Sequence, residues 1–424
     1  MIEQETAAVA IANEDKQTTQ ASQMQSAPAY RFAKRMSRIG VSAVREILKV
    51  TERPEIISFA GGLPAPELFP VEAIARAHAE VFAANGNAAL QYSTTEGWLP
   101  LREWIAARMN SHGIETDANR ILITNGSQQG IDLVAKAFLE KGDKVIVENP
   151  TYIAALQVFN AYEAEFITLE SDDEGMRMDN LERVIQESNP KLIYLVADFH
   201  NPKGTTLALE RRKKLIEISR RYHVPILEDN PYGELRYRGE HLPKLAALDK
   251  DGLVIHLSTF SKTLSPGLRI GWVVAAAEII QELNIGKQAA DLHTSTIVQR
   301  AAARALETFD YEAHITGLCS VYGERCDTMI RAIEEHFPAQ TKWTKPQGGL
   351  FLWVELPENV NGTKLLDAAL QERVAFVPGA PFFATEEREN FIRLNFSNSK
   401  PERIVEGIAR LGKVIRQQVS KIGE

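Results

Sequence analysis

The stretch Leu253-Val-Ile-His-Leu-Ser-Thr-Phe-Ser-Lys-Thr-Leu-Ser-Pro-Gly-Leu-Arg-Ile-Gly-Trp272 joins two apolar runs through a short polar turn. The first run, residues 253–257, predicts a buried strand, and a second strand is expected over residues 270–275. About a dozen residues without a helical pattern separate them, barely enough for the crossover that parallel neighbours need. We therefore expect the second strand to run antiparallel to the first.

The polar turn contains one lysine, Lys262, between the two apolar runs. Burial lowers the pKa of a lysine and makes its amine nucleophilic, as Schiff-base chemistry requires. Thr259, Ser261 and Arg269 offer hydroxyl groups and a guanidinium that suit a phosphate monoester. An aldehyde carried on a phosphate would fit both features. The alternative is a lysine on a tight turn between two strands, and this short motif alone does not decide between them.

Upstream of this stretch, strands and helices alternate regularly. Strand-like runs lie at residues 121–124, 144–147, 165–169, 192–197, 225–228, 253–257 and 270–275, most of them separated by helical segments such as 129–139 and 209–222. This alternation is typical of βαβ units that form a largely parallel sheet covered by helices. The fold class is therefore α/β, with a mostly parallel seven-stranded sheet that contains one antiparallel strand.

The pattern changes after residue 277. A long helical stretch is expected from residue 278 to about 337, followed by strands near 349–355, 374–377 and 391–396 and helices near 363–372 and 402–419. These elements predict a second, smaller α+β domain. The expected division is a flexible tail (1–28), an N-terminal segment with a helix at 42–49 that packs with the small domain (29–70), a large domain (71–300) and a small C-terminal domain (301–424).

The composition limits the possible function classes. The 424 residues are 44% apolar and 25% charged, which is typical of a globular protein, and the net charge of −8 argues against general binding to nucleic acid or anionic membranes. No apolar run approaches the roughly 18 residues of a membrane helix, and the N-terminus lacks a signal pattern. Cys319 and Cys326 are interpreted as core thiols of a reducing compartment, not as metal ligands. We expect a cytoplasmic protein.

Polar residues follow several of the predicted strands, at the edge where parallel α/β sheets bind ligands. Ser127 opens a helix and would either bind a phosphate or cap the helix. Tyr152 offers an aromatic face for stacking or for packing, and Asn201 directly precedes a proline. Asp229 ends the fifth strand, three residues before Tyr232. A buried acid is costly unless a cation pairs with it, and a protonated pyridine nitrogen is one such cation.

Together with Lys262, these groups are what pyridoxal phosphate (PLP) requires. The order Asn201-Pro, Asp229-x-x-Tyr232, Ser261-Lys262 and Arg269 resembles the class I/II aminotransferases of the fold-type I PLP family, from about residue 30 to the C-terminus. The chain is most similar to the 2-aminoadipate aminotransferase branch. The shared phrases are Ser58-Phe-Ala-Gly-Gly-Leu-Pro-Ala-Pro-Glu-Leu-Phe-Pro70, Leu90-Gln-Tyr-Ser93, Gly126-Ser-Gln-Gln129, Ser261-Lys-Thr-Leu-Ser-Pro-Gly-Leu-Arg269 and Ala290-Asp-Leu-His-Thr294.

The resemblance implies a role for each matching residue in cofactor chemistry. Lys262 would carry the cofactor and move a proton between the substrate Cα and the cofactor, and Asp229 would keep the ring nitrogen protonated. Asn201 and Tyr232 would bind the ring hydroxyl, while Tyr152 would stack on the ring. The residues expected to hold the phosphate are Ser127, Gln128, Ser261 and Arg269.

The resemblance also implies a substrate site and a homodimer with shared active sites. Tyr92 would reach the phosphate in the neighbouring subunit. Arg393 would bind the substrate α-carboxylate in a bidentate fork, with Asn201 beside it and the Gly62 backbone closing over the same group. Arg45 matches a mobile arginine that binds acidic side chains in this branch, although a surface arginine is an equal interpretation.

Two departures from the family pattern could alter loop geometry or substrate choice. Lys203 replaces the small residue that usually follows Asn-Pro, and Asn230 stands where a second acid is common. The resemblance implies a PLP-dependent aminotransferase with a ping-pong mechanism. It would move the amino group of an L-amino acid (2-aminoadipate, aromatic or aliphatic) to a 2-oxo acid, with 2-oxoglutarate as the expected acceptor. Leu63 and the Phe382-Phe383 pair suggest a pocket for large side chains, or ordinary core.

Two other functions are compatible with the same scaffold. One is a PLP-dependent lyase or decarboxylase, although a clamped carboxylate at Arg393 favours transamination. The other is a PLP-binding regulator without turnover, because the branch includes domains of transcription regulators. The negative charge and the expectation that residues 1–28 form no DNA-binding domain argue against it.

Overall fold

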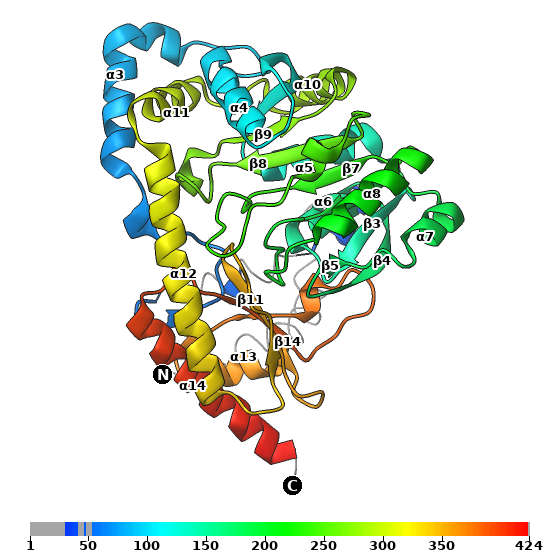
Figure 1. Cartoon of the computed structure of the whole chain (residues 1–424), viewed down its shortest axis with the longest axis vertical. Helices are drawn as coiled ribbons and strands as arrows, with labels where there is room; N and C mark the ends of the chain where they lie inside the picture. The colour runs from blue at the N-terminus through cyan, green and yellow to red at the C-terminus, as the bar shows by residue number, and fades with distance from the viewer. Residues whose placement is uncertain (1–29, 41–45, 48–52, 423–424) are drawn as a thin grey trace.

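The computed structural model describes residues 30–40, 46–47 and 53–422 of the chain. The predicted tail, Arg45 and most of the helix expected over residues 42–49 lie outside this described part. Figure 1 shows a large sheet flanked by helices and a smaller sheet near the C-terminus, with the long helix α12 (Tyr311–His336) running from one toward the other.

The large sheet has the strand order β2-β9-β8-β7-β6-β3-β4-β5. Its strands are β2 (Ile121–Thr124), β3 (Lys144–Asn149), β4 (Glu165–Asp172), β5 (Gly175–Met176), β6 (Leu192–Leu195), β7 (Ile226–Asp229), β8 (Val254–Thr259) and β9 (Gly271–Val274). The seven predicted strands are confirmed, and the two-residue strand β5 adds an eighth at one edge. As the short connection predicted, β9 runs antiparallel to β8, and it is also antiparallel to β2.

Helices cover both faces of this sheet. One face carries α4 (Leu99–Ser111), α7 (Leu181–Ser188), α8 (Leu209–Tyr222) and α9 (Leu245–Leu248), and the other carries α5 (Ser127–Phe138), α6 (Ile153–Ala161) and α10 (Ala277–Asp291). Successive side chains of a strand point to opposite faces, so the apolar core divides in two. Ile193 and Leu195 of β6 pack toward α7 and α8, whereas Leu192 and Tyr194 pack in the core that contains α5 and α6.

The helical stretch expected over residues 278–337 is three helices, namely α10, α11 (Thr296–Thr308) and α12. Two short turns interrupt it. Leu292, which follows α10, has a φ of 64° and a ψ of −61°, outside the helical region, so α10 ends there. The carboxylate of Asp310 accepts a hydrogen bond from the Ala313 backbone N–H (2.9 Å) and so caps the start of α12. Helix α11 packs along α3 (Val71–Leu90).

The smaller sheet is antiparallel, with the order β10-β11-β14-β13. Its strands and the helices beside them are β10 (Lys342–Trp343), β11 (Phe351–Glu355), β13 (Val377–Pro378), β14 (Phe391–Asn395), α13 (Gly362–Gln371) and α14 (Pro401–Ile422). Strand β1 (Ile57–Ser58) pairs in parallel with β12 (Val374–Ala375), so the N-terminal segment lies beside this sheet. Short 3₁₀ helices span Lys34–Arg38, Pro66–Leu68, Ala118–Arg120, Pro266–Leu268 and Ala380–Phe382.

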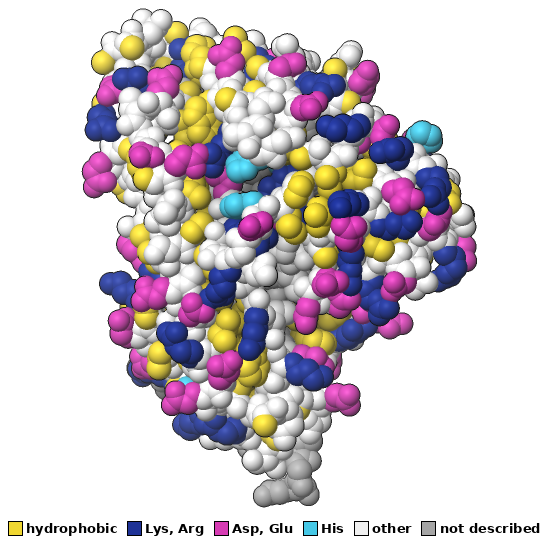
Figure 2. All heavy atoms as spheres, viewed as in Figure 1, with side chains coloured by type: hydrophobic (Ala, Val, Ile, Leu, Met, Phe, Trp, Pro, Cys, Tyr) yellow, Lys and Arg dark blue, Asp and Glu magenta, His cyan; other side chains and the backbone are white. Residues whose placement is uncertain are grey.

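On the face shown in Figure 2, basic and acidic side chains are interspersed. Cys319 and Cys326 both lie on α12 as free thiols, the second of them buried. Among the described residues, no helix is long and apolar enough to cross a membrane, and no group of three or more His, Cys, Asp or Glu side chains is arranged to hold a metal ion.

Candidate active site

A cavity of about 610 Å³ opens at the carboxyl ends of the central strands. The predicted site residues that line it are Gly62, Ser127, Gln128, Tyr152, Asn201, Asp229, Tyr232, Ser261, Lys262, Arg269 and Arg393. They come from distant parts of the sequence: from β7 and the turn after β8, but also from β14 of the smaller sheet and from the N-terminal segment. The cavity walls are therefore shared between the two sheets.

Lys262 lies in the turn between β8 and β9, with its amine in the cavity. Its Nζ donates a hydrogen bond to the Gly62 carbonyl (2.7 Å). Burial, together with the positive charges of Arg393 and Arg269, lowers the pKa of Lys262 to about 8. A neutral, nucleophilic amine is therefore accessible close to neutral pH, which an ordinary lysine does not offer.

Asp229 ends β7 and is buried, with 2% of its surface exposed. Its Oδ2 accepts a hydrogen bond from Tyr194 Oη (3.0 Å), while its Oδ1 has no partner among the described residues. Tyr194 pairs with Leu227 across β6 and β7, so Tyr194 and Asp229 point to the same face of the sheet. Burial raises the pKa of Asp229 to about 6, against the opposing effect of the Tyr194 hydrogen bond.

Arg393, on β14, is a second buried charge, with 3% exposed. Its Nη1 donates to Asn201 Oδ1 (2.9 Å) and its Nη2 to the Ala60 carbonyl (2.7 Å). The guanidinium lies over the rings of Phe351 (4.3 Å) and Phe382 (5.2 Å), while Nε has no partner among the described residues. Burial lowers the pKa of Arg393 to about 10. A carboxylate would relieve the cost of burying this charge.

The turn before α5 and the turn after β8 meet at one end of the cavity. Arg269 Nη2 donates to the Asn125 carbonyl (2.9 Å). Gly126 has a φ of 80°, and a Cβ there would overlap the Arg269 guanidinium, so only glycine fits. Ser127 begins α5, whose first backbone N–H groups are open to an anion. This arrangement of a helix start, hydroxyls and a guanidinium suits a phosphate.

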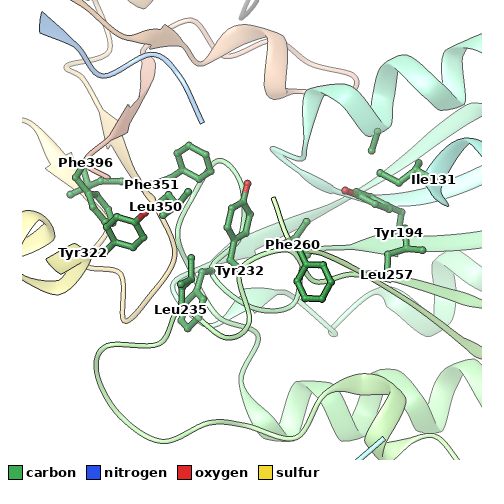
Figure 3. Packing of buried hydrophobic residues seen from close by; sticks show 14 of the residues in the cluster. Ile131, Tyr194, Tyr232, Leu235, Leu257, Phe260, Tyr322, Leu350, Phe351 and Phe396 are labelled. Atoms are coloured by element: carbon green, nitrogen blue, oxygen red, sulfur yellow. The ribbon is translucent and has the colours of Figure 1, made fainter. Parts of the chain in front are cut away.

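Three further predicted residues form the wall between the lysine and the arginine. Asn201 and Tyr232 are buried, and the Tyr232 ring meets Phe351 edge-on at 5.7 Å (Figure 3). Tyr152 precedes α6 and is half-buried at the cavity edge. The Gln128 side chain donates to the Ala154 carbonyl (3.1 Å), which leaves its backbone N–H as the group nearest a phosphate.

Three described residues named from the sequence lie elsewhere. Tyr92 is 78% exposed, outside the cavity, with its ring edge-on to His293. Lys203 does not line the cavity, because its Nζ donates to the Ser171 and Asp172 carbonyls (2.9 and 3.0 Å). Asn230 is buried and does not line the cavity either, and Arg45 lies outside the described residues.

Sequence reasoning missed Tyr194 and the wall that α6 contributes. Tyr194 reads as an ordinary core residue of a buried strand, and Figure 3 shows it packed near Ile131 and Leu257. Its hydroxyl nevertheless reaches the acid of the site. Ile153, Ala154 and Gln157 of α6 line the cavity, as do Leu63 and Phe382, whereas Phe383 does not. Residues 153, 154 and 157 are spaced three and four apart, which predicts that they share one face of a helix, and this was the available signal.

These groups match the chemistry of PLP. The buried, unpartnered Oδ1 of Asp229 is an acceptor for the N–H of a protonated pyridine ring, and the neutral amine of Lys262 suits its aldehyde. With such a site at the edge of a mostly parallel sheet, the chain is a PLP-binding α/β protein of fold type I.

Comparison with known proteins identifies the family. Residues 55–411 match the model of the aminotransferase class I and II family, and the chain belongs to that family. It is 44% identical to aromatic-amino-acid aminotransferase 1 of Thermococcus litoralis, over 92% of this chain and 95% of that protein. The chain is a PLP-dependent aminotransferase, which transfers an amino group from an amino acid to a 2-oxo acid.

Two solved structures agree in fold over nearly the whole chain. The kynurenine aminotransferase of Pyrococcus horikoshii, in complex with PMP, has a TM-score of 0.88 at 44% identity and covers 92% of this chain and 97% of its own. LysN, the α-aminoadipate aminotransferase of Thermus thermophilus, has a TM-score of 0.87 at 39% identity, with coverage of 92% and 98%. The LysN structure contains N-(5'-phosphopyridoxyl)-L-leucine.

Proposed function

We propose that this enzyme is a broad-range aminotransferase that takes 2-aminoadipate, aromatic or aliphatic L-amino acids as donors, uses 2-oxoglutarate as acceptor and follows a ping-pong mechanism. The observation that carries the proposal is Arg393, a buried guanidinium held between two aromatic rings without a carboxylate among its described contacts. Both the donor and the acceptor present an α-carboxylate, so one such arginine serves both half-reactions.

The range of donors follows from the rest of the cavity. Leu63, Ile153 and Phe382 give it an apolar wall, and Gln157 adds one polar group. An apolar pocket discriminates only weakly between side chains of different length. The relatives support this range, since one acts on aromatic amino acids, one on kynurenine and one on α-aminoadipate by name. Arg45 is proposed to bind the distal carboxylate of acidic substrates.

The residues have separate roles in the proposed reaction. When bound, PLP supplies an aldehyde that condenses with amines and a ring that withdraws electrons from the substrate Cα. Lys262 Nζ would take the proton from the substrate Cα and deliver it to C4′, the former aldehyde carbon of the cofactor, and a pKa near neutrality suits this transfer. Asp229 Oδ1 holds the proton on the ring nitrogen. Asn201 and Tyr232 bind the ring hydroxyl, and Tyr152 stacks on the ring.

The phosphate is proposed to lie against Ser127, the Gln128 backbone, Ser261 and Arg269. We define these four residues as the phosphate seat. The Thr259 hydroxyl accepts a hydrogen bond from the Ser261 backbone N–H (3.1 Å), which fixes the turn that carries Ser261. Arg393, with Asn201 beside it and the Gly62 backbone above, binds the substrate carboxylate.

We also propose a homodimer in which Tyr92 completes the phosphate site of the partner subunit. Tyr92 is highly exposed, and Leu90 and Leu292 near it are exposed apolar side chains (70% and 53%) that a subunit interface would cover. The free thiols of α12 support a cytoplasmic location. The domain division at residues 28, 70 and 300 is kept as a proposal; the pairing of β1 with β12 supports the part of it that places the N-terminal segment with the small domain.

The deciding experiment is a donor and acceptor panel with product analysis. Transamination yields a new amino acid and a 2-oxo acid, whereas a lyase releases ammonia and a decarboxylase releases CO₂. Lys262→Ala should abolish turnover and the visible absorption of bound cofactor. Release of ammonia or CO₂ without amino transfer, or turnover that survives Lys262→Ala, would overturn the proposal.

Two arginine variants separate carboxylate binding from side-chain recognition. Arg393→Ala should raise KM for every donor, by roughly 10- to 100-fold if one charged hydrogen-bond pair is lost. Arg45→Ala should raise KM for 2-aminoadipate and leave KM for leucine or phenylalanine unchanged. Equal effects of Arg45→Ala on all donors would remove its role in specificity.

A further inference from the structure

An ion pair on α10, formed by a buried lysine and a partly exposed aspartate, contacts the turn that leads into α5. Lys287 is completely buried, and its Nζ donates to both carboxylate oxygens of Asp291 (2.8 and 3.0 Å) and to Gln129 Oε1 (2.7 Å). Asp291 belongs to the phrase Ala290-Asp-Leu-His-Thr294, which the cofactor roles described above leave unused. Neither residue lines the cavity.

The ion pair holds both ends of the segment 125–129. Asp291 Oδ2 accepts hydrogen bonds from the side chains of Asn125 and Gln129, the latter at 2.7 Å. Gln129 Oε1 in turn accepts from the Asn125 backbone N–H (2.9 Å). Asn125 and Gln129 are therefore fixed on either side of Ser127 and Gln128 in the sequence. The backbone of these two residues belongs to the phosphate seat.

Arg269 and Gly271 also contact the segment 125–129. The Asn125 carbonyl accepts from Arg269, and a Cβ at Gly271 would lie 2.6 Å from the Ser127 backbone nitrogen. The segment is therefore held by Arg269 and Gly271 as well as by Lys287 and Asp291. Burial would raise the pKa of the Asp291 carboxyl, but hydrogen bonds from Lys287 and Gln129 outweigh burial and lower that pKa. The carboxylate stays ionised and available to both amides.

The positive charge of Lys287 gives the Lys287–Asp291 pair a second role, which is electrostatic. A phosphate ester carries close to two negative charges near neutral pH. A lone carboxylate behind the phosphate seat would repel it, and Lys287 neutralises that carboxylate at hydrogen-bond distance.

We propose that Lys287 and Asp291 are positioning residues for the cofactor phosphate: Asp291 sets the Asn125–Gln129 segment, and Lys287 prevents Asp291 from repelling the phosphate. This inference rests on the phosphate seat proposed above. It predicts that changes at the pair weaken binding of the phosphorylated cofactor specifically, because neither residue lies near the ring.

The test compares two probes, PLP and pyridoxal, which differ only in the phosphate. The full-length chain is stripped of cofactor and titrated with each, following absorption and intrinsic fluorescence. Asp291→Asn and Lys287→Met should each raise the Kd for PLP by about tenfold or more, the effect of losing a hydrogen bond to a charged group. The Kd for pyridoxal should change less than about twofold.

The double variant adds a sharper criterion. Lys287→Met alone leaves the carboxylate unbalanced, so adding Asp291→Asn should recover part of the PLP affinity. Glu282→Gln, on the exposed side of α10, is the matched control and should leave both affinities unchanged. Equal losses for PLP and pyridoxal, or strictly additive losses in the double variant, would overturn the proposal.

One more variant separates this inference from the proposed site. Ser127→Ala lies in the phosphate seat itself and should weaken PLP but not pyridoxal. If Ser127→Ala behaves so while the α10 variants bind PLP normally, the inference about Lys287 and Asp291 is wrong and the phosphate seat is right. If Ser127→Ala also has no selective effect, the phosphate seat is wrong.

Discussion

Replacing Asp229 by asparagine should stabilise the cofactor-free enzyme while it destroys cofactor binding. Burial raises the pKa of this carboxyl from 3.8 to about 6. A difference of about 2 pH units corresponds to about 3 kcal/mol, by which the ionised side chain disfavours the folded state. Asparagine keeps an oxygen for Tyr194 but carries no charge, so it removes most of this cost.

The sign of the effect follows from proton linkage. Below the unfolded pKa of 3.8 both states are protonated and the carboxyl costs nothing. Between pH 3.8 and about 6 only the unfolded state is ionised, so the stability of the cofactor-free protein falls as pH rises. Above about pH 6 the full penalty applies. The advantage of Asp229→Asn should therefore be largest at about pH 7.5 and about half as large at about pH 5.

The assay is thermal unfolding of the cofactor-free chain at fixed scan rate. With an unfolding entropy of about 2.1 cal/mol/K per residue, about 3 kcal/mol corresponds to a Tm increase of roughly 3 °C for a chain of this length. With PLP added, the wild type should have the higher Tm, because ligand binding stabilises it by RT ln(1 + [L]/Kd) and the variant does not bind PLP. A variant without cofactor that is no more stable than the wild type at about pH 7.5, or whose advantage persists unchanged at about pH 5, would refute the reasoning.

Three further outcomes follow from the cavity. Because the pKa of Lys262 is about 8, the neutral amine and hence the rate of PLP uptake by the stripped chain should rise about tenfold between pH 7 and pH 9; a flat profile would contradict this. Tyr194→Phe removes the hydrogen bond that lowers the pKa of Asp229, so PLP affinity should be lost at a higher pH on acidification than in the wild type, as titrations from pH 5 to pH 8 would detect. Gly126→Ala should weaken PLP binding by more than about tenfold, because its methyl group overlaps the guanidinium of the phosphate seat. Gly142→Ala, at a similar φ of 86° in open space, should cost about 1 kcal/mol of stability and leave PLP affinity intact; equal effects on affinity would show that backbone strain alone matters.

The sequence predicts most of the site because parallel sheets bring their carboxyl ends together. Asp229 ends a largely apolar strand, and Asn201 and Lys262 follow two others; such strands can be predicted without knowing their order in the sheet. The order of the strands in the sheet decides which side chains become neighbours, and the sequence does not indicate that order. Tyr194 meets Asp229 only because β6 lies beside β7 in one register, and nothing local in Leu-Ile-Tyr-Leu indicates that neighbour.

Lys287 and Asp291 illustrate the same limit on a helix. A lysine four residues before an aspartate usually indicates an exposed pair of small energetic effect. Here the packing of α10 on α5 buries the lysine and turns the pair toward Asn125 and Gln129. The breaks in the stretch 278–337 were also missed, because neither the turn at Leu292 nor the start of α12 at Asp310 contains a glycine or a proline.

The three ionisable groups at the centre of the cavity share one physical property. Burial shifts the pKa of Asp229 up to about 6, and shifts that of Lys262 down to about 8 and that of Arg393 down to about 10. Each shift is toward the neutral form, so each group is destabilised by the cavity before its partner arrives. The ring nitrogen of PLP would offset the cost at Asp229, and its aldehyde would offset the cost at Lys262. The substrate carboxylate would offset the cost at Arg393. Part of the binding energy at this site therefore offsets the unfavourable desolvation of these groups, which is why we expect Asp229→Asn to raise the stability of the empty protein and to abolish its function.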